Sequence, residues 1–461
     1  MNKEVTRYPT YKPSCIDWLG VIPSHWELSR LKWATELPVN GVWGSEANGD
    51  EYDTLCIRVA DFDRQRLIVD KQNEKTYREI EDKDLKNRSL KTGDLLLEKS
   101  GGGEKQLVGA VIQYDLEERA VSSNFVARMR PRESFDSRYL AYLYKHLYSG
   151  NVNYCSIKQT TGIQNLDSQA YLDEKVAFPP YPEQKAIASF LNHQTSRIDQ
   201  LIEKKKRLLE LPDEQRQAII TNAVTKGINP DAPMKESGID WLGDVPEHWD
   251  IEKLKYFIQL NSREVDFDDD EDIVKVALEN IESGTGKLSF EDDDKSFQGK
   301  GNPFSNGDIL FNKLRPYLAK VIHAEFNGVA VGELLVLTPD KSALESKFLF
   351  YRLLSDQFIK IVNNSTYGAK MPRANWDFIG NLRIGIPPLH EQLEIGTYLN
   401  QRVKQFDHLK TKIQTAIDRL EEYRSSLITQ AVTGKIDVRD TVQEVEMSYA
   451  AEEGELYKTN E

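Results

Sequence analysis

The sequence has few cysteines, no long apolar run and no excess of positive charge. Nothing approaches the run of about 18 apolar residues that a transmembrane helix needs. Residues 1–14 lack the hydrophobic segment of a secretory signal. Cys15, Cys56 and Cys155 lie too far apart for a disulfide framework or a zinc knuckle. We therefore expect a cytoplasmic protein without a membrane span.

Basic residues are outnumbered, 60 Lys and Arg against 74 Asp and Glu, which gives a net charge of −14. The acidic excess is concentrated in 266–272, 291–294 and the last residues of the chain. Because binding depends on the local field of a surface, this balance does not exclude a DNA-binding protein. We expect the first two stretches to form a solvated face, or else to dock a partner or repel DNA. Residues 437–461 are typical of a disordered acidic tail.

Catalytic motifs are also missing. The glycine-rich residues 101–105 lack the spacing and the Ser/Thr of a phosphate-binding loop. The Asn-Pro-Phe of 302–304 has no cofactor loop beside it and is typical of a turn. Residues 339–347 imitate a nuclease signature at too short a spacing, and helix capping explains their glutamate better. Since no nucleophile, base and orienting group come together, we predict that the chain is not itself an enzyme.

An internal duplication is the strongest positive signal. Residues 14–33 return 223 residues later as 237–256. Two further segments return after 208 residues, 178–192 as 386–400 and 223–228 as 431–436. The residues shared by the first pair include Trp18, Pro23, His25, Trp26, Leu31 and Lys32, which recur as Trp241, Pro246, His248, Trp249, Leu254 and Lys255. Shared ends with divergent middles indicate one scaffold that carries two different domains.

The two divergent middles share a faint order of elements. Each has a Gly-Asp turn followed by an apolar run, 91–99 and 305–313, which predicts a buried strand. Each then has a short helical pattern, 137–144 and 346–353. We predict two α+β domains of about 150 residues. The repeated His25 and His248 have no metal-ligand partners at suitable spacing, so a packed turn beside a tryptophan is favoured.

A heptad pattern follows each Pro-Pro pair. It predicts helices over about 183–225 and 391–432, each about 60 Å long. Neither helix can bury its apolar seam alone, so we expect the two to pack on each other. The predicted packing residues are Leu191, Ile198, Leu201, Leu208, Ile219, Leu399, Phe406, Leu409, Ile413, Leu420 and Leu427.

The first helix has two faults in this seam, Lys205 and Pro212. Proline lacks a backbone donor, so Pro212 is expected to kink or interrupt the helix near Leu208. Alternatively, 211–213 ends one helix and starts another.

The order of these elements resembles that of the specificity subunits of type I restriction-modification systems. The likeness covers about residues 14–436. It rests on Pro-Pro-x-x-Glu-Gln at 179–184 and 387–392, on the duplicated IDWLG…P.HW segment and on the two Gly-Asp turns. It implies two target-recognition domains, each reading one half of a bipartite asymmetric DNA target. An antiparallel coiled coil of the two long helices would hold them apart in a pseudo-two-fold arrangement, set the gap and dock two modification subunits.

The resemblance also implies a division of labour among subunits. Methyl transfer from S-adenosylmethionine would belong to the modification subunits, and the use of ATP and Mg²⁺ to partner chains that include the restriction and translocase subunits. The present chain would bind double-stranded DNA and hold neither cofactor nor metal. The expected divisions are 1–177, the first recognition domain; 178–230, the first spacer helix; 231–385, the second recognition domain; 386–436, the second spacer helix; and 437–461, the tail.

Base reading needs donors and acceptors on loops, and phosphate binding needs cations. In each domain the best loops are the one after the Gly-Asp strand and the polar one before the Pro-Pro pair. The predicted DNA-binding residues are Lys99, Ser100, Gly101, Lys105, Lys158, Thr160, Thr161, Gln164 and Asn165, and in the second domain Lys313, Arg315, Tyr367, Lys370, Arg373 and Asn375. Alternatively, these are ordinary solvated loops.

Two other classes of function stay open on the sequence. One is a duplicated protein–protein scaffold that gathers partners without reading DNA. The other is an enzyme fused from two copies, such as a nuclease, against which the lack of a duplicated catalytic constellation weighs.

Overall fold

The computed structural model describes residues 6–50, 53–102, 106–160, 163–267, 273–290, 299–368 and 370–440. Several sequence predictions fall outside these ranges: Lys105, Thr161, most of the acidic stretch 266–272, all of 291–294, and 441–461.

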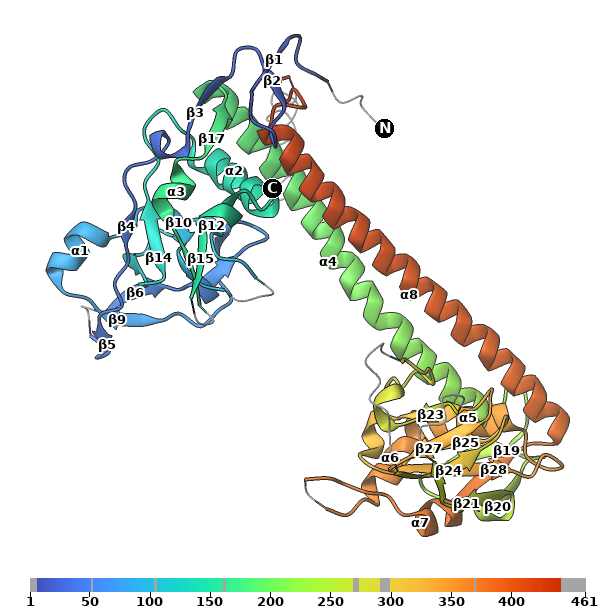
Figure 1. The fold of residues 1–461 in the computed structure, drawn as a ribbon. Helices are drawn as coiled ribbons and strands as arrows, with labels where there is room; N and C mark the ends of the chain where they lie inside the picture. Colours follow the sequence, from blue (N-terminus) through green and yellow to red (C-terminus); the bar gives the residue numbers. More distant parts are fainter. Residues whose placement is uncertain are drawn as a thin grey trace, which may run out of the picture. The chain divides into compact units, whose positions relative to one another are not determined.

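The chain forms two compact units, each of which includes part of both long helices. The first unit comprises Met1–Lys204 and Ile417–Glu461, and the second comprises Lys205–Ala416. The helices are α4 (Tyr181–Lys226) and α8 (Leu389–Val432), and Figure 1 shows both. In the first unit, the carboxyl-terminal part of α8 lies beside the amino-terminal part of α4, because Asp199 and Arg424 form an ion pair there.

The first unit contains three principal sheets, with strand orders β12-β10-β14-β4, β13-β6-β9-β5 and β11-β16-β15. Their bounds are β4 Val39–Asn40, β5 Ser45–Glu46, β6 Asp53–Ile57, β9 Tyr77–Glu79, β10 Leu95–Glu98, β11 Ser100–Gly101, β12 Val111–Gln113, β13 Ala120–Ser122, β14 Val126–Met129, β15 Ile157–Thr160 and β16 Ile163–Leu166. Smaller pairs are β1 (Tyr11–Pro13) with β2 (Val21–Pro23), β3 (Glu27–Arg30) with β17 (Lys175–Phe178), and β7 (Phe62–Asp63) with β8 (Ile68–Val69). The helices are α1 Asp82–Arg88, α2 Ser137–Ser149 and α3 Ser168–Leu172, with 3-10 turns η1 Leu31–Trp33, η2 Val59–Asp61 and η3 Val152–Ser156.

The second unit contains two four-stranded sheets, β21-β28-β25-β26 and β22-β24-β27-β23. Their bounds are β21 Ile258–Asn261, β22 Val265–Phe267, β23 Lys275–Val276, β24 Gly299–Phe304, β25 Ile309–Asn312, β26 Val321–His323, β27 Gly328–Val331 and β28 Leu334–Pro339. Smaller pairs are β18 (Met234–Glu236) with β19 (Asp244–Pro246) and β20 (Asp250–Lys253) with β29 (Arg383–Ile386). The helices are α5 Ser346–Leu354, α6 Asp356–Asn364 and α7 Trp376–Asn381, with 3-10 turns η4 Leu254–Tyr256, η5 Leu278–Asn280 and η6 Pro316–Leu318.

One sheet has the same connectivity in both units. The order β4-β14-β10-β12 corresponds strand for strand to β21-β28-β25-β26. The second sheets share a parallel pair, β6 with β13 and β23 with β27. Their added strands differ, because β9 joins β6 in the first unit whereas β24 joins β27 in the second. The prediction of two related but unlike α+β domains agrees with these sheets.

The Gly-Asp turns precede buried strands, as predicted. Gly93 and Gly307 both have φ of +95°, a conformation that favours glycine. The carboxylates of Asp94 and Asp308 then accept from the backbone N–H three residues earlier, at 2.8 and 2.7 Å. The strand that follows is buried at every residue in both units. Each turn therefore fixes where its central core strand begins.

The long helices have nearly the predicted bounds, and α4 is continuous through Pro212. The predicted interruption is therefore wrong. Pro212 removes the hydrogen bond that its N–H would donate, but its side chain is buried and the helix continues on both sides of it. A kink at this position stays a prediction.

The predicted seam is half right. Leu191, Ile198, Leu399, Phe406 and Leu427 are buried, and Ile219, Ile413 and Leu420 are half-buried. By contrast, Leu201, Leu208 and Leu409 are 48, 47 and 45% exposed, so their prediction as helix-pair packing residues is wrong.

The other buried flank of the seam lies four residues after the seven-residue series that includes Leu191, Ile198 and Leu399, whereas the predicted Leu201, Leu208 and Leu409 lie three residues after that series. This flank includes Thr195, Ile202, Arg216, Ile417 and Arg424. Several of these side chains are polar and are buried because they find hydrogen-bond partners. The apolar positions of the sequence do not mark this flank of the seam, because several of its buried residues are polar.

The chain after α8 is ordered further than predicted. The N–H of Asp437 donates to the carbonyl of Thr6 at 2.8 Å, Val438 is buried, and the guanidinium of Arg439 lies 5.1 Å from the ring centre of Tyr8. A tail beginning at residue 437 is therefore wrong. These residues close the end of α8 against the amino-terminal segment.

The glutamate of the Pro-Pro-x-x-Glu-Gln motif binds the repeated His-Trp pair. Glu183 accepts hydrogen bonds from the Trp26 indole at 2.8 Å and the Tyr8 hydroxyl at 2.6 Å, and lies 2.7 Å from His25 Nε2. In the second unit Glu391 makes the corresponding contacts with Trp249 and His248 at 3.2 and 2.7 Å. The predicted packed turn is confirmed, and the carboxylate holds it on the start of each long helix.

The glutamine of the same motif binds the backbone of the recognition region. The Gln184 amide oxygen accepts from the N–H of Asp136 at 2.9 Å, and Gln392 does the same with Glu345 at 2.8 Å. Asp136 and Glu345 are the N-cap residues of α2 and α5. Each motif thus joins three parts of its unit: the duplicated segment that contains the His-Trp pair, the start of the long helix, and the recognition region between them in the sequence.

Candidate nucleic-acid interface

In the first unit, the two loops predicted to bind DNA belong to one small sheet. Strand β11 pairs with β16, with Ser100 opposite Asn165, and β16 pairs with β15, with Lys158 opposite Asn165. The Ser100 hydroxyl also donates to the Asn165 amide oxygen at 2.6 Å. Lys99 is joined to the same sheet, because its carbonyl accepts from the N–H of Leu166 at 2.8 Å. The structure therefore brings together the residues that two separate loops supply.

The strand alternation divides these residues between two faces. Along β16 the odd positions, including Asn165, are exposed and the even ones are buried. Gln164 is only 3% exposed, and its amide oxygen accepts from the N–H of Val108 at 3.2 Å. Its prediction as a DNA-binding residue is therefore wrong, because its side chain lies inside the domain and is bonded there.

The cations of this face differ in how far they are neutralised. Lys158 pairs with Asp167 at 2.8 Å, and the hydrogen bond from Lys158 lowers the pKa of that carboxyl group. Lys99 has no ion-pair partner within the described ranges, and burial lowers its pKa. The N–H of Lys99 donates to the carbonyl of Phe125, whose ring is exposed. Phe125 was missed because it is an isolated aromatic in a turn. Gly101 lies in β11, and of Thr160 only the backbone is described.

In the second unit, the loops over 313–318 and 366–375 are joined by backbone hydrogen bonds. The N–H of Arg315 donates to the carbonyl of Pro372 at 2.7 Å, and that of Ala374 donates to Lys313 at 2.9 Å. Figure 1 shows the connection between α6 and α7, which contains residues 366–375, extending away from the sheets. Here too, two segments predicted separately form one surface.

Two of the predicted cations share one carboxylate. Glu333 lies 3.4 Å from the Lys313 amine and 2.5 Å from the Arg373 guanidinium. Arg315 and Lys370 are exposed and have no ion-pair partner among the residues that the structure places. They are therefore better placed to bind phosphate or a base edge. The equivalent of Glu333 in the first unit is Phe125, since each carbonyl accepts from the N–H after the Gly-Asp strand.

Aromatic and strained residues complete this second face. Tyr367 is 64% exposed and Tyr317, which sequence reasoning missed, is 53% exposed. Arg315 has φ of +50°, a left-handed conformation that is costly for a residue with a side chain. Asn375 caps α7, because its amide oxygen accepts from the N–H of Asp377 at 3.0 Å. The amide oxygen of Asn375 is thus already used within the protein.

Each face gathers polar and charged groups beside an exposed aromatic ring. Within the described ranges no group of three or more His, Cys, Asp and Glu residues could hold a metal ion. In the same part of the chain, no helix is long and apolar enough to cross a membrane. Each face instead combines exposed cations, amides or hydroxyls with an exposed aromatic ring, a combination suited to nucleic acid.

Comparison with known proteins identifies relatives over most of the chain. Residues 64–211 and 246–419 match the family model of the type I restriction modification DNA specificity domain. The chain is 25% identical over 284 residues to the type I restriction enzyme EcoDI specificity subunit of Escherichia coli, covering 57% of this chain and 63% of that one. It is 23% identical over 443 residues to the putative type I restriction enzyme MjaX specificity subunit of Methanocaldococcus jannaschii, covering 91% and 96%. The chain thus spans less than two thirds of the EcoDI relative.

Solved structures share the fold at low sequence identity. One is a chain from a structure that describes complex assembly and conformational transition of the type I R-M system. It aligns with a TM-score of 0.65 and 14% identity, covering 89% of this chain and 98% of that one. The HsdS subunit from Thermoanaerobacter tengcongensis aligns with a TM-score of 0.55 and 14% identity, covering 90% and 98%.

Proposed function

The chain belongs to the family defined by the type I restriction-modification DNA specificity domain, of which it carries two regions, and we propose that each unit reads one half of a bipartite, asymmetric DNA target. The observation that carries this proposal is that each unit gathers its two predicted loops on one exposed face, and that the two faces differ. Phe125 in one face stands where Glu333 stands in the other. Faces that carry different side chains are expected to bind different half-sites. The family match does not favour an adaptor that leaves DNA unread.

The proposed divisions are those expected from the sequence: 1–177, 178–230, 231–385 and 386–436. They are supported by the bounds of α4 and α8 and by the sheet that both units share. We also propose that the chain itself is non-catalytic. S-adenosylmethionine, ATP and Mg²⁺ would then be bound by the modification and restriction subunits.

The spacer of this proposal is an antiparallel coiled coil with pseudo-two-fold symmetry. In the first unit Asp199 of α4 pairs with Arg424 of α8 at 2.9 Å, and in the second Asp213 pairs with Lys410 at 2.8 Å. The residue numbers rise along one helix as they fall along the other, which supports an antiparallel pair. Such a spacer is stiff, so the gap between the half-sites is expected to have a fixed length.

The proposal is tested by mapping methylated bases in a host that carries this chain with its partner subunits. We expect two unlike half-sites at one fixed spacing. A contiguous methylated sequence, or two identical half-sites, would contradict it.

A first prediction concerns the unpaired cations of the second face. Arg315→Ala and Lys370→Ala are each expected to weaken DNA binding by the assembled complex. Each lost phosphate contact is expected to lower the slope of log K against log salt concentration by about 0.9. The measurement is a salt titration of affinity. Arg383→Ala removes an exposed cation of β29 and serves as the control. If both variants keep the affinity and slope of the unaltered complex, the assignment of this face is wrong.

A second prediction concerns the leucines that the seam leaves exposed. Leu201 and Tyr423 are exposed on the helices of the first unit, and Leu208, Leu211 and Leu409 on those of the second. Exposed apolar residues on a helix suggest a docking surface, and we propose that the modification subunits bind there. The double variant Leu201→Asp, Leu409→Asp is expected to weaken the binding of these subunits at least about tenfold. The reason is that burying two exposed leucines under a bound subunit contributes well over about 1.4 kcal/mol.

The measurement is co-purification of modification subunits across a range of concentrations. The control is Gln200→Asp with Gln401→Asp, which adds the same charge at exposed positions of the same helices. Equal binding by the two double variants would place the docking surface elsewhere.

A further inference from the structure

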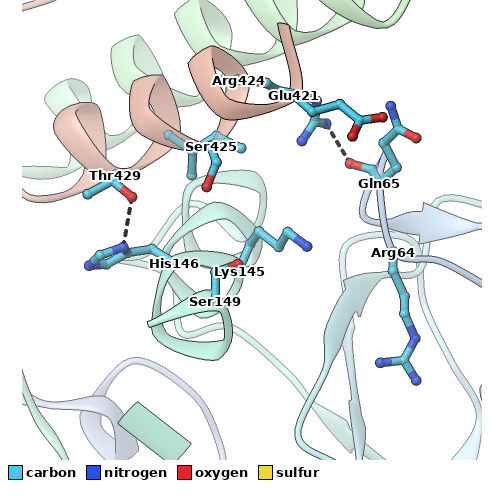
Figure 2. Close-up of a pocket in the computed structure, with 10 residues that line it drawn as sticks. Arg64, Gln65, Lys145, His146, Ser149, Glu421, Arg424, Ser425 and Thr429 are labelled. Atoms are coloured by element: carbon cyan, nitrogen blue, oxygen red, sulfur yellow. Dashed lines mark hydrogen bonds between the residues drawn. The ribbon is translucent and has the colours of Figure 1, made fainter. Parts of the chain in front are cut away.

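A buried arginine joins the recognition region of the first unit to both long helices. The Arg424 side chain of α8 bonds to Asp199 of α4 at 2.9 Å and to the backbone carbonyl of Gln65 at 2.5 Å. The Gln65 amide donates to the same carboxylate at 2.8 Å. Gln65 lies in the turn between β7 and β8, and Figure 2 shows the guanidinium of Arg424 directed at it. Three segments far apart in the sequence thus meet in one closed set of hydrogen bonds. We call this set of Arg424, Asp199 and Gln65 the joint of the first unit.

The second unit has a related joint, in which the arginine bonds to backbone carbonyls and the aspartate bonds to a lysine. Arg216 of α4 is buried and donates to the backbone carbonyls of Gly284 and Thr285 at 2.5 and 2.7 Å. Asp407 of α8 lines the same cavity as Arg216. Asp407 also pairs at 2.8 Å with Lys287, which follows Gly284 and Thr285 in the same turn. Burial lowers the pKa of Arg216, and the carboxylate of Asp407 opposes that shift.

The arginine and the aspartate of the two joints lie at corresponding positions of the duplication. Arg216 and Arg424 are 208 residues apart, as are Asp199 and Asp407, and this is the offset between the two Pro-Pro-x-x-Glu-Gln motifs. The helices exchange roles: α8 supplies the arginine in the first unit and α4 supplies it in the second. The duplication has therefore kept both members of the pair on opposite helices.

The accepting turns differ in sequence, and the bonds from the arginines do not depend on the turn side chains, although Gln65 and Lys287 add side-chain bonds to the two aspartates. Arginine donates to backbone carbonyls in both turns, and every residue has a carbonyl. The planar guanidinium can bind a carboxylate and a carbonyl together, which a lysine amine does with less geometric restraint. Corresponding arginines of the two long helices can thus hold two unlike domains by the same contact, a bond from the guanidinium to a backbone carbonyl.

The joint is a further attachment point for the recognition region, beyond the bond of Gln184 to Asp136 and the bonds of Tyr142 to Asn192 and Thr195. In the first unit, Glu183 fixes the start of α4 and Asp199 lies 16 residues further along it, a distance of about 24 Å. Among these attachments on α4 the joint lies furthest from the start of the helix, so it has the longest lever against a tilt of the domain. A cavity of about 350 Å³ lies beside Arg424, lined also by Lys145, His146 and Ser149 of α2, so space for such a tilt exists.

We propose that Arg424 and Arg216 are positioning residues that fix the tilt of each recognition domain on the helices, and thereby the length of unread DNA that the complex accepts between the half-sites. This inference rests on the proposed reading of a bipartite target. It assigns the gap to two side-chain joints as well as to the length of the helices.

The experiment measures methylation by the assembled complex on targets with the mapped gap and with one base pair more or less. Arg424→Ala and Arg216→Ala are expected to reduce the preference for the mapped gap by about tenfold, because small errors in position change rates by large factors. Discrimination against mismatches within each half-site is expected to stay unchanged. Arg424→Lys keeps a charge beside Asp199 and Gln65→Ala removes one bond of the ring, so both are expected to give intermediate preferences.

The matched control is Arg419→Ala, an exposed arginine of α8 five residues from Arg424. It is expected to keep the full preference. The inference is overturned if assembled Arg424→Ala complexes keep the gap preference, or lose gap and half-site discrimination to the same extent. If Arg424→Ala does not assemble, an unchanged preference in both Arg424→Lys and Gln65→Ala overturns it. A complex of the unaltered chain that ignores the second half-site would instead contradict the proposed function.

Discussion

A chimera in which residues 34–177 come from another specificity subunit is expected to methylate a target with one half changed. The other half and the gap are expected to stay the same. All the proposed DNA-binding residues of the first unit lie within the exchanged segment. Gln184 and Arg424, which bond to that segment, lie outside it.

The contacts between scaffold and recognition region explain why the exchange should be tolerated. Gln184 bonds to the backbone N–H of Asp136 and the carbonyl of Ser134. Arg424 bonds to the carbonyl of Gln65, and β17 pairs with β3 through backbone hydrogen bonds. Backbone groups are present in any sequence. A domain with the same chain path can therefore keep these backbone contacts with different side chains, whereas the bonds of Arg138 and Tyr142 to Asn192 depend on the incoming residues.

The measurement is a map of methylated bases for the parent and the chimera in the same host. The reciprocal exchange in the second unit, over residues 257–382, is the control and is expected to change the opposite half. An unchanged target, or a change in both halves from one exchange, would contradict the division of reading between the units.

The scaffold was predictable from the sequence because the duplication marks it. Residues that return at a fixed offset, such as Trp26 with Trp249 and Glu183 with Glu391, predicted the packed turns and the starts of the helices. Their physical roles were not predictable, because hydrogen bonds between residues over 140 positions apart leave no local pattern. The polar half of the buried seam was missed for the same reason. Arg216 and Arg424 look like surface residues until their partners are known.

The DNA-binding faces were predictable only as loops. The Gly-Asp strand and the polar segment before Pro-Pro indicated where donors gather, and the structure brings the two together in each unit. Which side chains stay available depends on strand register and on local partners. Gln164 is buried by the alternation of β16, and Arg373 is neutralised by Glu333 from a strand-to-strand turn. Neither fact follows from composition.

Loss of the Glu183 carboxylate is expected to have the largest effect on stability. Glu183 is 6% exposed and holds Tyr8, His25 and Trp26 on the start of α4. Glu183→Ala leaves the buried Trp26 indole and Tyr8 hydroxyl without an acceptor. Bonds to a charged acceptor contribute about 1.5–3 kcal/mol each and are not additive. We expect a loss of about 3–5 kcal/mol in the free energy of unfolding of the first unit.

The duplication supplies a graded series of controls for this prediction. Glu391 receives two bonds, one of them 3.2 Å long, and Tyr8 has no counterpart there, so Glu391→Ala is expected to cost less, about 1–3 kcal/mol. Glu183→Gln keeps the oxygen that accepts from both Tyr8 and Trp26, and is expected to cost about 1 kcal/mol. Glu394→Ala, at an exposed position of α8, is expected to change little. Hydrogen exchange in each unit measures the two losses separately, because the units need not unfold together. Equal losses from Glu183→Ala and Glu391→Ala would show that the bond from Tyr8 adds nothing to the junction.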